Sequence, residues 1–542
     1  MIRVNEIKLD LNEDKGRIPV KTARRLGIPE SRLISCRIFR ESIDARNNDD
    51  IKFVYSVDVE VANEAELLKK SVKLRIEKCT EETYRPPAAG ANAMRNRPVI
   101  VGFGPCGMFA ALILAEQGYR PIVIERGKPM DQRTEDVKRF WKNGILDPES
   151  NVQFGEGGAG AFSDGKLTTQ IRDHRVRKVL IELAAAGGPE EILYKQKPHI
   201  GTDILRGTVV AIREKIIRCG GEIRFSSRLS GIIADGIRTT SGENTDPEDI
   251  PADAVILAIG HSARDTMAML NESGLAMERK PFSIGVRIEH PQSVIDRAQY
   301  GRHAGNPNLG PAEYKLSHRC GDGRGVYTFC MCPGGLVIGA ASEDGGVVTN
   351  GMSYHSRNAA NANSAVLVDV RPEDFPTEHP LAGIEFQRVW EKKAFTLGGS
   401  SYKAPAQRIG DFLGVGEESD ADEKIRRAVT PTYQPGVVWA DLHGCLPAFA
   451  SKAIEEALPS FGRKIDGFCS PDAVMTGVET RSSSPVRIIR DPEMRGSIAS
   501  IYPAGEGAGY AGGIVSAAVD GIRAAEAVIG RYAPSLYAKA DL

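Results

Sequence analysis

Three glycines near residue 100 have the spacing of a phosphate-binding turn. They are Gly102, Gly104 and Gly107, and they give the pattern G-x-G-x-x-G. The first permits a tight turn, the second lets a pyrophosphate approach the backbone, and the third allows a helix to pack closely on a strand. Because the helix that follows also offers free N–H groups at its N-terminus, the turn, with Pro105 and Cys106, predicts a dinucleotide site.

The segments around this turn occur in the order that dinucleotide binding needs. An apolar strand over Val99–Val101 precedes the turn, and an apolar helix over Met108–Gln117 follows it. A second strand over Pro121–Ile124 then ends at Glu125. This acid, 18 residues after Gly107, is expected to accept hydrogen bonds from an adenosine ribose.

Two later segments favour a flavin over a nicotinamide. Ala252–Gly260 is predicted to be a buried strand that ends in glycine. Ile501–Gly530 holds a strand, a glycine-dense turn at Gly505 and Glu506, and a helix from about Gly512. The N-terminus of this helix would face the same cleft, where it can stabilise negative charge on a reduced flavin ring. A domain that binds only NAD does not need this third element, so the sequence predicts FAD.

These segments resemble the FAD-binding domain of the two-dinucleotide-fold flavoproteins, in the branch of p-hydroxybenzoate hydroxylase and the fumarate reductase flavoproteins. More narrowly, the chain is similar to the bacterial family of uncharacterised FAD-dependent dehydrogenases. The strings that carry this resemblance are VQFGEGGAGAFSDGKLTT (152–169), KPHIGTD (197–203), AIGHSAR (258–264), FCMCPGG (329–335), TRSSSPVRIIR (480–490) and PAGEGAGYAGGI (503–514). The resemblance implies FAD as the cofactor and does not name a substrate.

The resemblance also implies roles for single residues. The glycines of the first turn would hold the pyrophosphate, and Glu125 would hold the ribose. The other implied contacts are Arg126 beside the adenine, Gly260 at the end of the strand that closes over the dinucleotide, Glu506 toward the ribityl chain, and the N–H groups of Gly513 and Ile514 at the pyrimidine edge of the flavin. Glu506 stands where the wider superfamily usually has Asp, which shifts the carboxylate by one methylene.

The glycine-rich stretch Gly155–Lys166 is predicted to be a loop against the flavin ring, since only glycine lets backbone come so close. It repeats the G-x-G-x-x-G pattern, but polar residues follow it in place of an apolar helix. The expected backbone contacts are Gly157, Gly158, Ala159 and Gly160. The polar side chains available for proton transfer or substrate anchoring are Ser163, Asp164 and Lys166. The alternative is that Ser163 and Asp164 only cap the turn.

Two further groups of side chains are candidates for chemistry. His199 would act either as a general acid or as a structural hydrogen-bond partner. Val326–Cys332 alternates like a strand, which would place Cys330 and Cys332 on one face and Tyr327, Phe329 and Met331 in the core.

Three interpretations of Cys330 and Cys332 compete: inert thiols, a redox or substrate-binding pair, or a metal or cluster site shared with His318 and Cys320. The spacing matches none of the usual zinc or iron–sulfur patterns, so no metal is predicted. Two rises of a strand span about 6.6 Å, which would strain a disulfide and make it easily reduced. We therefore expect free thiols.

These motifs require a split α/β fold with a doubly wound parallel sheet. We predict an N-terminal α+β domain over 1–85, a Rossmann-like FAD/NAD(P)-binding domain over 97–275 and 476–542, and a substrate or cap domain over 276–475. A strand is expected over Pro281–Glu289, and a substrate-side loop over Leu397–Gly416. The N-terminal domain should contain strands over Ile2–Leu9, Lys52–Val61 and Val72–Cys79 and helices over Pro19–Leu26 and Ala65–Ser71.

Composition narrows the class of protein. The 542 residues hold 70 Lys and Arg against 71 Asp and Glu, so no net field favours nucleic acid or an anionic membrane. The longest apolar stretch, Met108–Ala115, is far shorter than the roughly 20 residues of a spanning helix. The N-terminus lacks a secretory signal, and nine scattered cysteines are not a disulfide framework. The sequence thus predicts a cytoplasmic protein.

We expect an FAD-dependent oxidoreductase, of the dehydrogenase or reductase type, with a small organic substrate. Its electrons would be exchanged with transient NAD(P)H or a protein donor, because the sequence holds no second strand, glycine turn, helix and acid for a nicotinamide domain. The alternative is a flavin-bearing RNA-modification or macromolecule-binding protein, against which the near-neutral charge counts.

Overall fold

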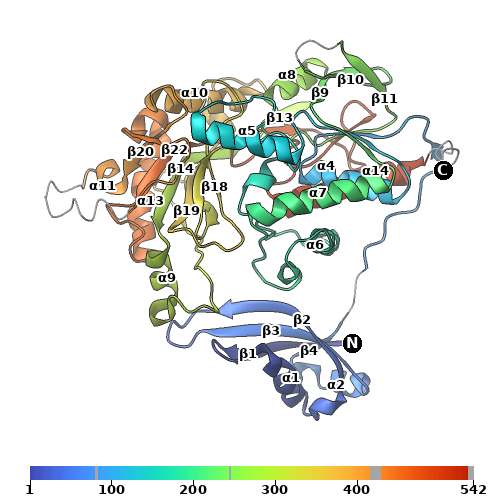
Figure 1. Ribbon diagram of the computed structural model, residues 1–542, viewed down its shortest axis with the longest axis vertical. Coiled ribbons are helices and arrows are strands. Elements are labelled where there is room, and N and C mark those ends of the chain that lie inside the picture. The colour runs from blue at the N-terminus through green and yellow to red at the C-terminus, as the bar shows by residue number, and fades with distance from the viewer. Residues whose placement is uncertain (80–82, 243–245, 416–428, 535–542) are drawn as a thin grey trace.

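The computed structural model describes residues 1–79, 83–242, 246–415 and 429–534 (Figure 1). The N-terminal residues form a four-stranded antiparallel sheet in the order β2-β3-β1-β4. Its strands are β1 (Ile2–Asp10), β2 (Leu33–Asp44), β3 (Lys52–Val61) and β4 (Ile76–Lys78), and its helices are α1 (Ile18–Leu26), α2 (Glu64–Leu68) and α3 (Ser71–Leu74).

Two features of this N-terminal sheet differ from expectation. The predicted strand over Val72–Cys79 is wrong in its first half, because residues 71–74 form α3 and only 76–78 form β4. The long strand β2 escaped prediction, because at the edge of the sheet its burial follows no regular alternation.

A five-stranded parallel sheet lies at the centre of the molecule, in the order β24-β12-β6-β7-β8. Its strands are β6 (Val99–Val101), β7 (Ile122–Ile124), β8 (Glu222–Arg224), β12 (Val255–Leu257) and β24 (Ile501–Pro503). The order reverses between β6 and β12, which makes the crevice at their carboxyl ends the expected ligand site. β24, from near the C-terminus, completes the sheet, so the α/β fold is split in sequence as predicted.

Both faces of this sheet are covered, which explains why its strands are continuously apolar. One face packs on α4 (Pro105–Glu116), α6 (Arg175–Ala185), α7 (Thr202–Arg218) and α14 (Ile514–Arg531). The other packs on α8 (Arg264–Glu272) and on a small sheet of β9 (Arg228–Ile233), β10 (Gly236–Thr240) and β11 (Glu248–Pro251).

A seven-stranded sheet forms the second large layer, in the order β15-β16-β19-β14-β22-β20-β21. Its strands are β14 (Phe282–Pro291), β15 (Ser317–Arg319), β16 (Gly325–Cys332), β19 (Asn361–Val370), β20 (Ala404–Arg408), β21 (Val437–Trp439) and β22 (Val474–Glu479). Its associated helices are α9 (Gln292–Tyr300), α10 (Ala382–Leu397), α11 (Ile409–Phe412) and α13 (Ala448–Lys464). β14 confirms the strand expected over Pro281–Glu289.

The remaining elements connect these layers. They are α5 (Met130–Asn143) and the strand pairs β5 (Asn92–Ala93) with β25 (Tyr532–Ala533), β13 (Met277–Arg279) with β23 (Val486–Ile488), and β17 (Leu336–Gly339) with β18 (Thr349–Met352). The predicted domain limits stay a prediction; the limit at 476 falls inside β22. No helix of the described ranges has both the length and the apolar character to cross a membrane.

The contact between α4 and α14 gives a first test. A Cβ on Gly521 of α14 would lie 2.0 Å from the Cys106 carbonyl oxygen of α4, whereas a Cβ on Gly530 of the same helix meets nothing within 4 Å. Gly521→Ala should therefore destabilise the protein by about 1–3 kcal/mol, because the helices must separate. Gly530→Ala is the matched control and should be neutral or stabilising by up to about 1 kcal/mol. Equal melting temperatures for both variants would contradict this backbone-to-backbone packing.

Candidate functional site

A large cavity of about 640 Å³ opens where the strand order of the parallel sheet reverses. We call it the central cavity. Val101 at the end of β6 and Ala258 just beyond β12 border it, as do Pro105 and Ile514 at the starts of α4 and α14. Two helix N-termini thus offer N–H groups and positive dipole ends to one ligand.

The three glycines of the first turn differ in what a side chain at each position would meet. Gly102 has a φ of +99°, and a Cβ there would lie 2.4 Å from the Ala258 carbonyl oxygen. A Cβ on Gly107 would lie 1.9 Å from the Gly102 carbonyl oxygen, so the helix could not begin where it does. At Gly104 a Cβ would meet only the Gly158 Cα, at 3.7 Å. Gly104 is therefore not required by the fold, and its missing side chain leaves backbone open to a ligand.

Most of the predicted cofactor residues line the central cavity: Gly102, Gly104, Pro105, Cys106, Glu125, Arg126, Gly158, Ala159, Gly160, Gly260, Glu506, Gly513 and Ile514. Gly107, Gly157 and Gly505 are not part of the lining. They lie behind the lining. Gly505, for example, has a φ of +76°, and a Cβ there would lie 2.8 Å from the Cβ of Cys106.

The carboxylate of Glu125 has a broader role than the predicted ribose contact. It accepts hydrogen bonds from the backbone N–H groups of Phe103 at 2.8 Å, Gly127 at 2.9 Å and Gly155 at 2.9 Å. These groups belong to the turn after β6, the segment after β7 and the glycine-rich loop. One buried carboxylate therefore joins the three loops that shape this part of the cavity.

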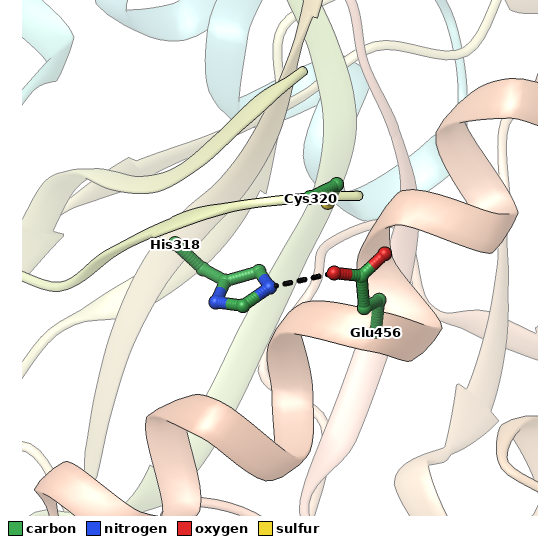
Figure 2. Close-up of side chains that lie close together, drawn as sticks. All are labelled: His318, Cys320 and Glu456. Carbon is green, nitrogen blue, oxygen red and sulfur yellow. Dashed lines mark hydrogen bonds and ion pairs between the residues drawn. The ribbon is translucent and has the colours of Figure 1, made fainter. Parts of the chain in front are cut away.

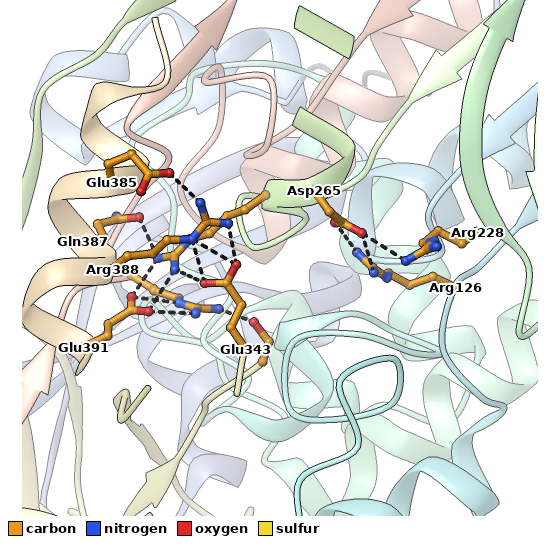
Figure 3. A network of polar contacts seen from close by, with 11 residues as sticks. Arg126, Arg228, Asp265, Glu343, Glu385, Gln387, Arg388 and Glu391 are labelled. Atoms are coloured by element: carbon orange, nitrogen blue, oxygen red, sulfur yellow. Dashed lines mark hydrogen bonds and ion pairs between the residues drawn. The ribbon is translucent and has the colours of Figure 1, made fainter. Parts of the chain in front are cut away.

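Arg126 forms a flat, positive surface at the same end of the cavity. Its guanidinium pairs with Glu149 and Asp265, each at 2.9 Å, and lies 4.2 Å from the centroid of the Phe154 ring. Arg228 also contacts Asp265, at 3.3 Å (Figure 3). These contacts fix the orientation of the Arg126 guanidinium, and its place beside the adenine stays a prediction.

A second ion network, separate from the group around Arg126, lies toward the second layer (Figure 3). Arg264, the neighbour of Asp265 on α8, pairs with Glu391 of α10 at 2.7 Å and with Glu343 at 2.5 Å. Arg481, which lines the cavity, shares Glu391 at 3.1 Å. Burial would raise the pKa of the Glu391 carboxyl, but the charges of Arg264 and Arg481 outweigh it and hold this pKa well below its usual range. The network therefore stays charged and ties α8 and α10 to the cavity wall.

Three side chains near the cofactor region were not predicted. Asp520 of α14 accepts a hydrogen bond from the Gly505 N–H at 2.7 Å and pairs with Arg490 at 2.8 Å. His261 lies with its Nδ1 3.3 Å from the Glu506 carboxylate. Its Nε2 is buried and has no hydrogen-bond partner among the described residues. The string AIGHSAR contained this histidine, but only the fold brings it beside Glu506.

The glycine-rich loop places two of the predicted polar residues in structural roles. The Ser163 hydroxyl donates to the Gly160 carbonyl at 2.8 Å and accepts from the Gly165 N–H at 3.0 Å, so it caps the turn. The buried Asp164 lines the cavity and pairs with Arg357 at 2.5 Å. These contacts favour the capping interpretation for Ser163 and add a buried ion pair at Asp164.

Lys166 and His199 differ in their access to the cavity. Lys166 lines it, and its ammonium donates to the Met331 carbonyl. His199 is not part of the lining; its Nε2 donates to the His355 carbonyl at 3.1 Å, and the two rings stack at 5.2 Å. Burial and the nearby Arg357 charge lower the pKa of His199, which keeps the ring neutral. This geometry favours the structural interpretation of His199 over the general acid.

The predicted alternation over Val326–Cys332 fails within β16. The three residue steps from Phe329 to Cys332 lie opposite only two residue steps of β19. β16 therefore carries one extra residue here, which is a β-bulge. Phe329 is 37% exposed and Tyr327 is half-buried, so of the three predicted core residues only Met331 is buried. Cys330 lines the central cavity, whereas Cys332 is buried and is not part of the lining. Both are free thiols, as predicted.

His318 and Cys320 do not join these two thiols. They lie beside Glu456 of α13, with the three potential ligand atoms within 4.8 Å of one another (Figure 2). The His318 Nε2 hydrogen-bonds to the Glu456 carboxylate at 3.0 Å. Burial and the Glu456 charge raise the pKa of Cys320 to about 11, so it remains a thiol at neutral pH. The four-residue metal interpretation of the sequence therefore lacks its geometry.

The other end of the central cavity faces the seven-stranded sheet. Its polar lining includes Lys166, Lys197, Glu313, Lys315 and Asn350. The loop predicted over Leu397–Gly416 does not reach it; within its described part, none of residues 400–403 lines the cavity. Tyr402 packs instead on Phe140, with ring centroids 5.3 Å apart.

This lining fits FAD. The open backbone at Gly104 suits the pyrophosphate, the Glu125 and Arg126 end suits the adenosine, and the start of α14 suits the flavin ring. The unpartnered Nε2 of His261 offers the cofactor a further polar contact. The split parallel sheet, the glycine turn and the second helix N-terminus together define an FAD-binding flavoprotein.

Comparison with known proteins agrees with this class. A family model described as "FAD-dependent protein, C-terminal domain-like" matches residues 281–482, and a domain of unknown function matches residues 1–60. An uncharacterized protein of Clostridium beijerinckii is 48% identical over 534 residues, which cover 98% of this chain and 99% of that protein. The chain belongs to the same family as that protein, a family of FAD-dependent proteins, and its cofactor is FAD.

Solved structures with a similar course of the chain are also flavoproteins. The flavin-dependent brominase Bmp2 is 12% identical, with 80% of this chain and 78% of that chain covered and a TM-score of 0.36. A flavoprotein/dehydrogenase from Cytophaga hutchinsonii is 11% identical, with 80% and 78% covered and a TM-score of 0.34. Such low scores carry no argument about this chain's reaction.

Glu125 gives the test of this site. Glu125→Ala should raise the Kd for FAD ten- to a hundredfold, because charge-assisted hydrogen bonds worth about 1.5–3 kcal/mol are lost. Glu125→Gln, which keeps the shape and one acceptor oxygen, should lose less. The measurement is titration of apoprotein with FAD, and Glu214→Ala, at an exposed position of α7, is the control. An unchanged Kd for Glu125→Ala would show that the ribose and the three loops are held by other groups.

Proposed function

We propose that the protein is an FAD-dependent oxidoreductase that passes hydride or electrons between a small organic substrate and non-covalently bound FAD. The observation that carries this proposal is the extent of the central cavity. The same cavity is lined by Gly104 at the dinucleotide turn and by Glu313 and Asn350 beyond the start of α14. A pocket that only stored the cofactor would not need this second, polar end.

When bound, FAD supplies the two-electron chemistry itself. The residues of the chain would position the substrate and stabilise charge on the cofactor. The N-terminus of α14, at Gly513 and Ile514, would stabilise negative charge on the ring during reduction, because its free N–H groups and dipole end point into the cavity.

The polar end would bind and orient the substrate. Burial would raise the pKa of Glu313, but the charges of Lys166, Arg357 and Lys197 outweigh it and lower this pKa, so the carboxylate is ionised at neutral pH. Lys166 and Glu313 thus present opposite charges to a substrate at the flavin, where Lys166 would donate and Glu313 would accept hydrogen bonds. These groups favour a small polar substrate.

The electron partner would bind transiently. Within the described ranges, the parallel sheet carries a single G-x-G-x-x-G turn followed by a helix, at residues 102–107. A nicotinamide would therefore have to enter over the flavin from the polar end, or a protein donor would take its place. Neither nucleic acid nor membrane binding is part of the proposal.

Release of the cofactor tests the non-covalent attachment. The purified protein should be yellow, and denaturation in acid should release the whole flavin into the supernatant. The reason is that the lining offers the cofactor hydrogen bonds and ion pairs, without a tethering bond assigned to any residue. Colour that stays with the precipitate would contradict non-covalent binding, and a colourless protein that takes up no FAD would contradict the cofactor.

Anaerobic reduction tests the reaction. We expect slow or absent bleaching of the flavin by NADH or NADPH alone, because no dedicated nicotinamide site is proposed. A screen of small metabolites should find one that bleaches the oxidised flavin or reoxidises the reduced flavin. Rapid stopped-flow bleaching by NADH or NADPH alone would overturn the expectation about the electron partner.

A further inference from the structure

Cys330 and Cys332 lie at the polar end of the central cavity in an arrangement that an ordinary strand does not provide. Cys330 is part of the lining, and the Cys332 thiol behind it has its sulfur 3.3 Å from the Cys330 carbonyl oxygen. The β-bulge of β16 falls on this pair, and Cys330 has a left-handed φ of +44°. A residue with a side chain adopts this conformation at a cost, so the surrounding contacts must maintain it.

Two cations hold the peptide segment between the thiols. Arg287 of β14, which is fully buried, donates to the Cys330 carbonyl at 2.8 Å and pairs with Glu479 at 2.7 Å. Lys166 donates to the next carbonyl, that of Met331. The bulge is therefore clamped from the sheet on one side and from the glycine-rich loop on the other. This clamp keeps Cys330 toward the cavity and Cys332 next to it.

The same groups favour unequal thiols. The neighbouring Cys332 side chain, together with the charges of Arg287 and Lys166, lowers the pKa of Cys330 and outweighs burial. The pKa of Cys332 is raised by the neighbouring Cys330 side chain and by burial. One thiolate beside one retained thiol is the starting state for thiol–disulfide chemistry. The Glu479 carboxylate and Asp164 also face this pair and oppose the thiolate, but the net direction is unchanged.

We propose that Cys330 and Cys332 are a redox-active dithiol that exchanges two electrons with the flavin. The inference rests on the proposed function for the presence of a reactive flavin at this end of the cavity. In the oxidative direction, the Cys330 thiolate and the Cys332 thiol lose two electrons and form one S–S bond. Oxidised FAD takes up the two electrons and the proton released by Cys332, which gives the reduced anionic cofactor. The reverse step returns the electrons from the flavin to the disulfide.

The pair adds a second electron store to the site. On a flat strand the Cα atoms would be about 6.6 Å apart, near the upper limit for a disulfide. The bulge replaces this regular geometry, so the flat-strand limit no longer applies. A dithiol within the substrate end would let the enzyme hold four electrons per chain, two on the flavin and two on sulfur. Substrates that are themselves thiols or disulfides then become the favoured class.

Thiol counting tests the pair without measuring turnover. The protein is reduced completely, freed of reductant, loaded with FAD and exposed to air, and its thiols are then counted after denaturation. Of the nine cysteines, two should be lost from the FAD-loaded protein and none from apoprotein treated in the same way. Peptide mapping should find Cys330 linked to Cys332. Nine thiols in the FAD-loaded protein would overturn the proposal, as would loss of a different pair.

Variants separate this proposal from the proposed function. Cys330→Ser and Cys332→Ser should each retain eight thiols with or without FAD, and reductive titration should take two electrons per chain where the oxidised wild type takes four. Cys36→Ser, in the N-terminal sheet, is the control and should lose two thiols as the wild type does. If the oxidised wild type takes up only two electrons per chain while a metabolite reduces its flavin normally, the dithiol is refuted and the proposed function is not. If the wild type takes up four electrons per chain but no metabolite reduces or reoxidises the flavin, the dithiol is supported and the proposed substrate reaction is refuted.

Discussion

The structure depends first on the backbone contact between α4 and α14. These helices lie far apart in the sequence, yet glycine at Gly521 lets α14 reach the Cys106 carbonyl of α4. Only this approach brings both helix N-termini to one cavity, so that a single ligand meets two positive dipole ends. The split of the fold in sequence follows from the same contact, because α14 and β24 must return to the sheet that β6 begins.

Buried charges connect the two layers of the molecule. Arg264 of α8 pairs with Glu391 of α10, which Arg481 shares, and this contact crosses from one layer to the other. The pair of Arg287 and Glu479 lies within the seven-stranded sheet. Such pairs contribute little net stability, but the loss of one partner leaves an uncompensated buried charge. Their geometry is therefore held firmly, and it fixes the position of the cavity wall relative to the nucleotide end.

The two ends of the cavity are built by different means. The nucleotide end uses backbone groups and one carboxylate, Glu125, whose three N–H partners lie in three loops. The other end uses side chains of opposite charge, including Lys166 and Glu313, and the thiol of Cys330. Backbone N–H groups suit a cofactor that is always the same, whereas side chains give a particular substrate its contacts. This difference is why the family and the fold establish FAD while the substrate remains a proposal.

The sequence by itself determined the dinucleotide turn and the parallel strands beside it, because glycine spacing, apolar strands and a following acid are local features. The choice of FAD came from the later segments over 252–260 and 501–530 and from the family resemblance. Tertiary structure alone decided which polar residues face the cavity. Lys166 and Met331 form a hydrogen bond although 165 positions separate them in the sequence. His261 contacts Glu506 only because β12 and β24 pair in the parallel sheet. The bulge that turns Cys330 toward the cavity depends on pairing with β19, which no periodicity within β16 reveals. Local spacing therefore predicted the dinucleotide site, and long-range pairing placed the groups that would act on a substrate.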